Sequence, residues 1–208
     1  IEMALRLLAD SPHSVSLTRL PARRLHEEIR AGRQDGLIGT RYTPERATLM
    51  AYPLAAGGPD TRRLLARVSY VLYHRRESPI QWNGTTLPNI HGTLGIPSGV
   101  TALRRLRGLD RIATVEAPNS QQLFSMLARG RVSAVVMLGA SGDRYIGEYE
   151  GAEIVRLDPP LIVEDFYIPF TRSFYEANRD FVEAFWRKLE QQRDSLYAEI
   201  LPSYRFNP

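Results

Sequence analysis

A repeated pattern of helix, glycine, arginine and strand constrains the fold of this chain most strongly. Residues 25–38 read LHEEIRAGRQDGLI, and residues 123–136 read LFSMLARGRVSAVV. Gly32 and Gly130 occupy the same place in the two segments, where a helix can end in a left-handed cap. An apolar strand follows each glycine at the same spacing. Unless the match is a coincidence, the repeat predicts two similarly built α/β lobes with a cleft between them.

Helical and strand-like patterns alternate along most of the chain. Before Gly57-Gly58-Pro59, which we interpret as a linker, they predict strands at 15–18 and 36–39 and helices at 22–31 and from 43 onward. After it, they predict helices at 101–107 and 120–129 and strands at 68–74, 93–96, 112–115, 132–138 and 153–157. Strands joined by single helices indicate mostly parallel sheets, because a parallel pair needs a return of helix length.

Both ends of the chain have helical spacing. The first eight residues place their apolar side chains on one face, and no residue before them can cap that helix. We therefore expect further residues before Ile1. Near the other end, apolar residues between 181 and 189 keep the same spacing, and Ser173 with Glu176 predicts a capping box.

The composition excludes several classes of protein. With 43% hydrophobic and 24% charged residues, the chain can bury a core. It contains no cysteine, so disulfide scaffolds, thiolate metal sites and cysteine nucleophiles are excluded. No apolar run approaches the roughly 18 residues of a membrane span. The net charge is +4, but the arginines in residues 61–111 are scattered between apolar residues without a recognisable motif, so we expect no nucleic-acid partner.

Three loops that follow predicted strands are the candidate binding segments, namely 39–46, 97–101 and 138–144. Open parallel sheets bind ligands at the carboxyl ends of their strands. In the first loop, Thr43 can cap a helix, Pro44 suits the first helical position, and Arg46 then projects from the first turn. A guanidinium there can bind a carboxylate through two hydrogen bonds. The alternative is that Arg46 only pairs with an acid on the surface.

The second loop offers another helix N-terminus with uncommitted donors. Ser98, Gly99, Val100 and Thr101 provide two hydroxyls, backbone N–H groups and a glycine that permits close approach of a ligand. The alternative is a plain turn between strand and helix. Two such termini facing each other would hold a small anion without metal or covalent chemistry.

Several segments, taken in order, carry a family resemblance: GRQDGLIGTRYTPER at 32–46, Tyr52-Pro53-Leu54, 69–75, Gln81-Trp82, 87–99, 130–136 and 166–181. Their order and spacing resemble those of the extracellular solute-binding proteins of family 3. These are the polar-amino-acid type of periplasmic binding proteins of ABC importers.

The resemblance implies an α/β, type 2 periplasmic-binding-protein fold, with two lobes that close on a ligand like a Venus flytrap. Lobe 1 would comprise residues 1–55 and 167–208, lobe 2 would comprise 56–166, and the first strand of lobe 1 would precede Ile1. The resemblance also implies a signal peptide, a periplasmic monomer without cofactor or metal, and an ABC permease as partner. The ligand would be a small molecule with a carboxylate.

The resemblance further assigns binding residues. In the family, the arginine of a T-x-x-R segment binds the carboxylate of the ligand, and Arg46 stands at that position. The polar stretch before it and the turn that enters lobe 2 supply further contacts, which correspond to Thr40, Arg41, Ser98, Gly99, Val100 and Thr101. Among the aromatic residues, Tyr167 lies close to the predicted cleft and is included, although most aromatic side chains are expected to be core or hinge packing.

One position departs from the family pattern. Amino-acid binders of the family commonly hold the ammonium of the ligand with an acid shortly after a G-R-[IV]-D segment. Here that segment is Gly130-Arg131-Val132-Ser133, and the acidic position is Leu138. An ammonium left unpaired in a dry cleft costs several kcal/mol, so we expect a small organic anion or an amino-acid-like ligand rather than a standard amino acid. Asp143 could replace the missing acid, but nothing in the sequence positions it.

Two other functions stay open at this point. A ligand-sensing domain of a signalling protein would use the same fold and the same residues. A dehydratase-like enzyme would need a general acid or base in the cleft, and the four histidines at 13, 26, 74 and 91 stand in contexts that favour surface or structural roles. No histidine pair or carboxylate cluster has metal-binding spacing, so we expect no metal.

Overall fold

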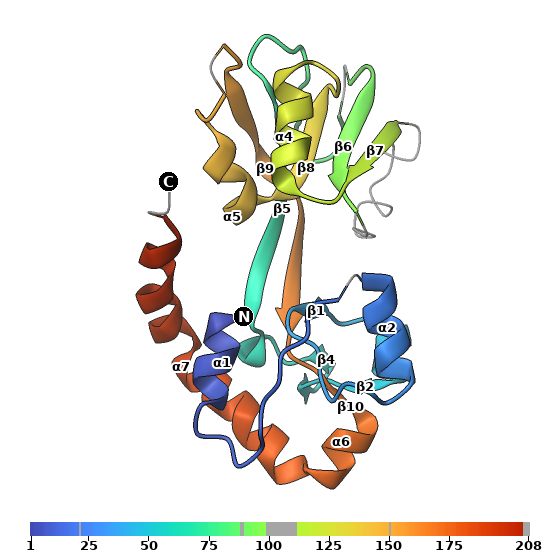
Figure 1. The fold of residues 1–208 in the computed structure, drawn as a ribbon, viewed down its shortest axis with the longest axis vertical. Coiled ribbons are helices and arrows are strands. Elements are labelled where there is room, and N and C mark those ends of the chain that lie inside the picture. The colour runs from blue at the N-terminus through green and yellow to red at the C-terminus, as the bar shows by residue number, and fades with distance from the viewer. Residues whose placement is uncertain (21, 88–89, 99–111, 150, 206–208) are drawn as a thin grey trace. The chain divides into compact units, whose positions relative to one another are not determined.

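The computed structural model describes residues 1–20, 22–87, 90–98, 112–149 and 151–205. The chain divides into two compact units, Ile1–Arg67 with Asp165–Pro208 (unit 1) and Val68–Glu164 (unit 2). Strands β5 (Ala66–Arg75) and β9 (Ile154–Tyr167) each have residues in both units and carry the chain from one to the other (Figure 1). The division at 55 and 167 that the family resemblance implies stays a proposal.

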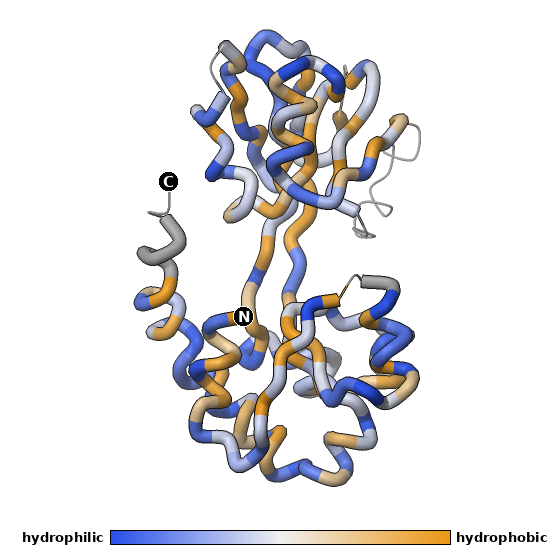
Figure 2. The backbone as a smooth tube through the Cα atoms, viewed as in Figure 1, coloured by the Kyte–Doolittle hydropathy of each residue, from blue (hydrophilic) through white to orange (hydrophobic). Residues whose placement is uncertain are grey.

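Unit 2 is built on a sheet whose central strands are buried on both faces. Its strands follow the order β9-β5-β8-β6-β7, with β6 at Thr93–Pro97, β7 at Ala113–Ala117 and β8 at Ala134–Leu138. Successive side chains of β5 and β8 enter opposite cores, because strand side chains alternate between faces. Leu72 and Val136 belong to one core, and Tyr73 and Val135 belong to the other. Figure 2 shows hydrophobic residues gathered in the middle of this sheet, where β5 and β8 pair.

Short helices flank this sheet. Helix α4 (Ser120–Ala128) begins at Asn119, whose side chain accepts a hydrogen bond from the N–H of Gln122, and it buries Leu123, Phe124 and Leu127. Helix α5 (Gly139–Gly142) and the 3₁₀ turn η4 (Asp143–Tyr145) follow β8 directly. The predicted strands of this half and the helix at 120–129 are thus confirmed, with ends that differ by one or two residues, except that the strand predicted at 153–157 continues to Tyr167 as β9. The predicted helix at 101–107 lies outside the described residues.

Parallel pairing is less extensive than the alternation predicts. Strand β6 is parallel to β7 and β8, but β5 is antiparallel to β8, and β1 (Thr40–Arg41) is antiparallel to β9. The expectation of mostly parallel sheets therefore holds only for the three strands β7, β6 and β8. The physical reason is the connection after β5, where the described residues between 76 and 92 form no helix. A connection without a crossover helix joins strands that run in opposite directions, so the strand after β5 runs antiparallel to it.

Unit 1 consists mainly of helices around very short strands. Its helices are α1 (Glu2–Leu8), α2 (Ala22–Arg30), α3 (Pro44–Ala47), α6 (Arg172–Ala177) and α7 (Arg179–Arg205), with a 3₁₀ turn η1 (Thr61–Arg63). Two-residue strands pair as β2 (Met50–Ala51) with β10 (Phe170–Thr171), and as β3 (Leu54–Ala55) with β4 (Gly58–Pro59). None of the helices that the structure describes is both long and apolar enough to span a membrane.

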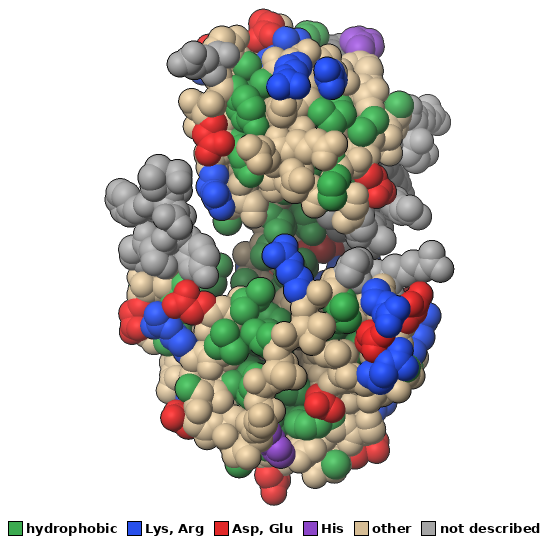
Figure 3. Space-filling view, in the orientation of Figure 1, with side chains coloured by type: hydrophobic (Ala, Val, Ile, Leu, Met, Phe, Trp, Pro, Cys, Tyr) green, Lys and Arg blue, Asp and Glu red, His purple; other side chains and the backbone are tan. Residues whose placement is uncertain are grey.

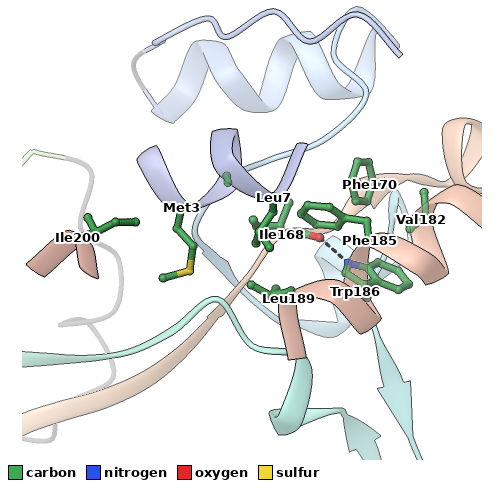
Figure 4. Close-up of a cluster of buried hydrophobic side chains, with 10 residues drawn as sticks. Met3, Leu7, Ile168, Phe170, Val182, Phe185, Trp186, Leu189 and Ile200 are labelled. Atoms are coloured by element: carbon green, nitrogen blue, oxygen red, sulfur yellow. Dashed lines mark hydrogen bonds between the residues drawn. The ribbon is translucent and has the colours of Figure 1, made fainter. Parts of the chain in front are cut away.

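The main core of unit 1 lies between its first helix and its last. Met3 and Leu7 of α1 pack with Val182, Phe185, Trp186 and Leu189 of α7 (Figure 4). The indole N–H of Trp186 donates to the carbonyl of Ile168 at 2.9 Å, so this buried polar atom is satisfied. The helical spacing predicted for residues 181–189 is confirmed, because these side chains form the buried stripe of α7.

The two copies of the repeated pattern end their helices in the same way. Gly32 has φ 66° and Gly130 has φ 68°. In each copy the glycine N–H donates to the carbonyl three residues earlier, and the following arginine N–H donates to the carbonyl five residues earlier. This pair of bonds is the Schellman motif. The helix ends that the sequence predicts are therefore confirmed.

Other local predictions are wrong. Residues 15–18 form no strand, and Val15 and Leu17 are exposed, because no described strand pairs with them. At 36–39 the chain forms an isolated bridge from Gly36 to Phe170 instead of a strand. The left-handed φ of Gly39, 78°, ends the extended conformation at that point.

The predicted linker and the predicted capping box are also not found. Gly57-Gly58-Pro59 lies at the turn of the β3–β4 hairpin inside unit 1, where positive φ angles of both glycines reverse the chain, and it is not a linker between the units. Helix α6 is capped by Thr171, whose hydroxyl accepts from the N–H of Phe174 at 3.4 Å. Ser173 is already inside the first turn, so the predicted capping box is wrong.

Candidate functional site

Arg46 is held by a short helix whose start the sequence specifies. Thr43 is extended, with φ −142° and ψ 153°, and its hydroxyl accepts a hydrogen bond from the N–H of Arg46 at 3.2 Å. Pro44 occupies the first helical position, where its missing N–H costs nothing. The predicted helix entry is confirmed, and it places the half-buried Arg46 one turn from Thr43.

The guanidinium of Arg46 is oriented by backbone and not by an acid. Its Nη1 donates to the carbonyl oxygen of Arg41 at 3.2 Å, and the hydroxyl of Tyr52 donates to the same oxygen at 3.0 Å. Among the described residues no carboxylate lies within ion-pair distance of Arg46. Among the described residues, Arg46 therefore does not pair with a surface acid, which was the alternative to a binding role. Of the hydrogen bonds among the described residues, its guanidinium, which carries five N–H groups, donates the one to Arg41.

Tyr52, which donates to this oxygen, belongs to a group of three tyrosines in contact. The Tyr52 ring makes edge contacts with the rings of Tyr42 and Tyr167, at centroid distances of 5.2 and 6.1 Å. Burial raises the pKa of Tyr52, and burial also raises the pKa of Tyr167 to about 12. Both phenols are therefore neutral hydrogen-bond donors at pH 7, and they do not compete with an incoming anion.

His26 reports the electrostatic character of this region. It is a half-buried residue of α2, and burial followed by the positive charges of Arg46 and Arg30 lowers its pKa. The imidazole is therefore neutral near pH 7. Burial is the largest cause of this shift, and the contribution of Arg46 shows that its positive charge acts on His26.

The other predicted residues of unit 1 lie next to Arg46 along the chain and across the strand pair. Thr40 and Arg41 form β1 and pair with Tyr167 and Phe166 of β9. Thr40 and Arg41 are half-buried, whereas Tyr167 is only 2% exposed and packs with the core around Leu37 and Met50. The structure thus brings the unit 1 candidates together, with Tyr167 behind the others. Their contacts to a ligand stay predictions.

In unit 2 the candidates follow the ends of β6 and β8. Ser98 comes directly after β6, is exposed, and donates its backbone N–H to the carbonyl of Ala117 at 3.0 Å. Gly99, Val100 and Thr101 lie outside the described residues. Leu138 is the last residue of β8, pairs with Tyr70 and precedes α5. The apolar side chain of Leu138 offers no partner to an ammonium.

Asp143 is already committed to other partners inside unit 2. The hydroxyl of the fully buried Tyr73 donates to its Oδ1 at 2.6 Å, and Nη1 of Arg156 donates to its Oδ2 at 2.8 Å. Burial, assisted by this hydrogen bond to Asp143, raises the pKa of Tyr73. Both carboxylate oxygens of Asp143 therefore already accept a hydrogen bond within unit 2.

The described histidines do not form a reactive cluster. His13 packs against the rings of Phe174 and Phe181, at 5.7 and 4.6 Å. His74 is buried, its Nδ1 has no hydrogen-bond partner in the structure, and burial lowers its pKa. Among the residues that the structure describes, no three histidine, cysteine, aspartate or glutamate side chains are grouped as metal ligands. On the visible face, acidic and basic side chains of each unit are interspersed (Figure 3).

Sequence reasoning missed Tyr52 as a site residue. Its hydroxyl and the Arg46 guanidinium share the carbonyl of Arg41, although Tyr52 lies eleven residues along the chain from it. The only signal was the tyrosine and proline at 52 and 53 within the family resemblance. Nothing local indicates that this hydroxyl reaches the end of β1.

No known family matches the sequence, and no curated protein matches it either. Solved structures do. A mutant of ArgBP from T. maritima has a TM-score of 0.74 at 18% identity, over 97% of this chain and 83% of that one. The GluR0 ligand-binding core from Nostoc punctiforme, in complex with (L)-glutamate, has a TM-score of 0.70 at 16% identity, over 95% and 88%.

A third similar structure is the amino acid ABC transporter substrate-binding protein AbpA from Streptococcus pneumoniae, bound to L-arginine. Its TM-score is 0.70 at 13% identity, over 98% of this chain and 82% of that one. At such identities the likeness shows the fold alone. The chain thus has the α/β fold of these solute-binding proteins, as the sequence predicts.

Proposed function

We propose that this chain is a solute-binding protein of the family 3 type, which closes two lobes on a small organic anion and delivers it to an ABC permease. The observation that carries the proposal is the guanidinium of Arg46, oriented by the Arg41 carbonyl and without an acidic partner among the described residues. The shared fold of amino-acid-binding proteins supports it. The protein would work in the periplasm as a monomer.

Arg46 would act as the carboxylate anchor. A guanidinium matches a carboxylate with two parallel hydrogen bonds, and its charge persists at every physiological pH. A charge-assisted hydrogen bond contributes about 1.5–3 kcal/mol when sheltered from water. Because the Arg41 carbonyl fixes one edge of the guanidinium, little orientational freedom is left to lose on binding.

The ligand class follows from what the two units offer. Unit 1 provides an unmatched positive charge near Arg46. In unit 2, Leu138 is apolar and Asp143 is bonded to Tyr73 and Arg156. The ammonium of an α-amino acid would then have no acidic partner, at a cost of several kcal/mol. We therefore propose a carboxylate without an α-ammonium, such as a dicarboxylate.

Closure would be driven by contacts made only in the closed form. A ligand shifts a two-state equilibrium by its difference in affinity for the two states. Arg46 would bind the ligand first, and Ser98 with Gly99, Val100 and Thr101 would add contacts from unit 2 when the lobes close. In this proposal, binding and closure use only these side chains and backbone groups.

Isothermal titration with succinate, pyruvate, L-glutamate and L-arginine tests the anchor. We expect succinate or pyruvate to bind more tightly than either amino acid. Arg46→Ala should weaken that binding roughly 10- to 150-fold, the range that corresponds to one charge-assisted contact. The matched control is Arg144→Ala, which removes an exposed arginine of unit 2. Equal affinities for wild type and Arg46→Ala would refute the anchor assignment.

A ligand-sensing domain is the second candidate. It is favoured by the likeness to the GluR0 ligand-binding core, whose name does not tie it to a transporter. Both candidates use the same binding residues, so titration does not separate them. The gene does: a transmembrane segment fused to this domain would favour sensing, whereas an adjacent permease gene would favour uptake.

We also propose that the chain has no catalytic role. The similar structures are named as binding proteins or a ligand-binding core. A dehydratase-like activity would need a general acid or base near Arg46, and the pKa of His26, lowered by burial first and then by Arg46, leaves that imidazole without the proton of a general acid at pH 7. Turnover of a prephenate-like cyclic carboxylate by the purified protein would contradict this.

A further inference from the structure

We propose that Arg172 is a positioning residue that holds the helix of Arg46 in its binding-competent conformation. The Arg172 guanidinium donates through Nε to the carbonyls of Ala47 and Thr48, at 3.0 and 3.2 Å, and through Nη2 to Ala47 at 2.5 Å. Its backbone N–H donates to the carbonyl of Leu49 at 3.1 Å. Arg172 therefore bonds to three consecutive carbonyls directly after the end of Arg46's turn.

Helix α3 needs such support because it has little of its own. It comprises only four residues, none of them buried. A single helical turn is unstable without external contacts. Thr43 satisfies a donor at its start, but the carbonyls at its end have no partner further along a helix. A cationic side chain at a helix C-terminus satisfies those carbonyls and opposes their partial negative charge.

The placement of Arg172 favours this role over a role in its own helix. It is the first residue of α6, and a positive charge at a helix N-terminus is unfavourable to that helix. Its side chain extends instead to α3, 125 residues earlier in the chain. The β2–β10 pairing and the bond from the Thr171 N–H to the Asp35 carbonyl, at 2.7 Å, hold the backbone of Arg172 in place.

The consequence for binding rests on the proposed function of Arg46. With α3 fixed at both ends, the Arg46 guanidinium stays on the Arg41 carbonyl. When the end of α3 frays, only a fraction of molecules presents the anchor, and the apparent affinity falls by that fraction. Arg172 would thus set the affinity without touching the ligand.

A purely structural role makes a different prediction, and Arg193 provides the matched control. Its Nη1 also donates to two backbone carbonyls of unit 1, those of Arg62 and Leu64, both at 3.2 Å. Arg172→Gln and Arg193→Gln therefore each remove guanidinium contacts to two backbone carbonyls, and Arg193→Gln also removes the bond from Nε to Asp194 at 2.8 Å. Arg172→Lys keeps the charge and one donor group, and it should restore part of the effect.

Amide hydrogen exchange tests the positioning without any ligand. The reporters are the N–H groups of Ala47 and Leu49, which donate to the carbonyls of Thr43 and Arg46. We expect Arg172→Gln to accelerate their exchange roughly tenfold, with a smaller effect of Arg172→Lys and none of Arg193→Gln. Unchanged exchange in Arg172→Gln, or equal acceleration in both glutamine variants, would overturn the proposal.

Titration with succinate then connects positioning to binding. Arg172→Gln should weaken succinate binding roughly 3- to 10-fold in the wild-type background and have no effect in the Arg46→Ala background, because the two residues act through one contact. Equal weakening in both backgrounds would overturn the coupling to Arg46. If succinate does not bind the wild type, the proposed function fails for that ligand, while the exchange rates still decide the role of Arg172.

Discussion

The two copies of the repeated pattern begin alike and end differently. Both helices stop at a left-handed glycine with the same two backbone hydrogen bonds. After Gly130 comes the five-residue strand β8, buried between two cores, whereas after Gly32 the chain forms one bridge at Gly36 and then turns at Gly39. The comparison teaches that a helix end is specified by a few local residues, whereas a strand also requires neighbouring strands.

The two units also differ in how they use charge. In unit 1 the Arg46 guanidinium binds a carbonyl and no described acid, and in unit 2 Asp143 is bonded on both oxygens. An unmatched cation on one side and a satisfied anion on the other favour a ligand that brings negative charge. The proposed ligand class rests on this difference between Arg46 and Asp143.

The largest expected effect comes from removing the central aromatic residue of one core at a time. Trp186→Ala in unit 1 and Phe124→Ala in unit 2 should each lower the free energy of unfolding by about 3–5 kcal/mol, because each leaves a large cavity. Amide exchange should show faster opening mainly in the unit that carries the change. Equally accelerated amide exchange throughout both units would show that the two units unfold together, and would contradict the view that each has its own core.

The next effect tests the shared helix ends directly. Gly32→Ala and Gly130→Ala should each lower the free energy of unfolding by about 1 kcal/mol, because alanine is strained at positive φ. An alanine Cβ meets nothing within 4 Å at Gly32, and at Gly130 it makes only ordinary contact with Arg75. Urea unfolding measures both. A neutral change at one position would break the equivalence of the two caps.

The smallest effect concerns acid and separates the two caps. In unit 1, hydrogen bonds from Arg33 first, and from Arg24, lower the pKa of Glu28 from 4.5 to about 2. Because the pKa is lower in the folded state, this stabilisation is complete above pH 4.5 and is lost as the pH falls toward 2. At the matching position of the repeat, unit 2 has Met126, which does not titrate.

Protection factors of the Arg33 and Arg131 amides between pH 2 and 6 check this difference. We expect the protection of Arg33 to fall with pH and that of Arg131 to stay constant in the same range. Glu28→Gln should remove the pH dependence at Arg33. A parallel decline at both amides would assign the acid sensitivity to global unfolding instead of Glu28.

Sequence reasoning predicted unit 2 better than unit 1. The central strands of unit 2, above all β8 with the sequence AVVML, are apolar on both faces, and that composition is visible in a single sequence. The strands of unit 1 are two residues long, too short to produce a period, and Gly39 ends an apolar stretch that otherwise resembles a strand.

For the candidate site, the sequence located Arg46 because threonine and proline mark a helix start within three residues. It could not locate the contacts made across the fold. Tyr52 reaches the Arg41 carbonyl, Arg172 reaches α3, and Tyr73 binds Asp143 only because distant segments pack together. No local pattern encodes those distances.

The central claim is that Arg46 holds a carboxylate ligand. Native mass spectrometry of the protein purified under native conditions from the cells that produce it tests this most directly, with wild type and Arg46→Ala compared at equal concentration. We predict that the wild type retains a small molecule whose mass matches an organic acid, and that Arg46→Ala is recovered without it. Retention of the same molecule by both proteins would contradict the account.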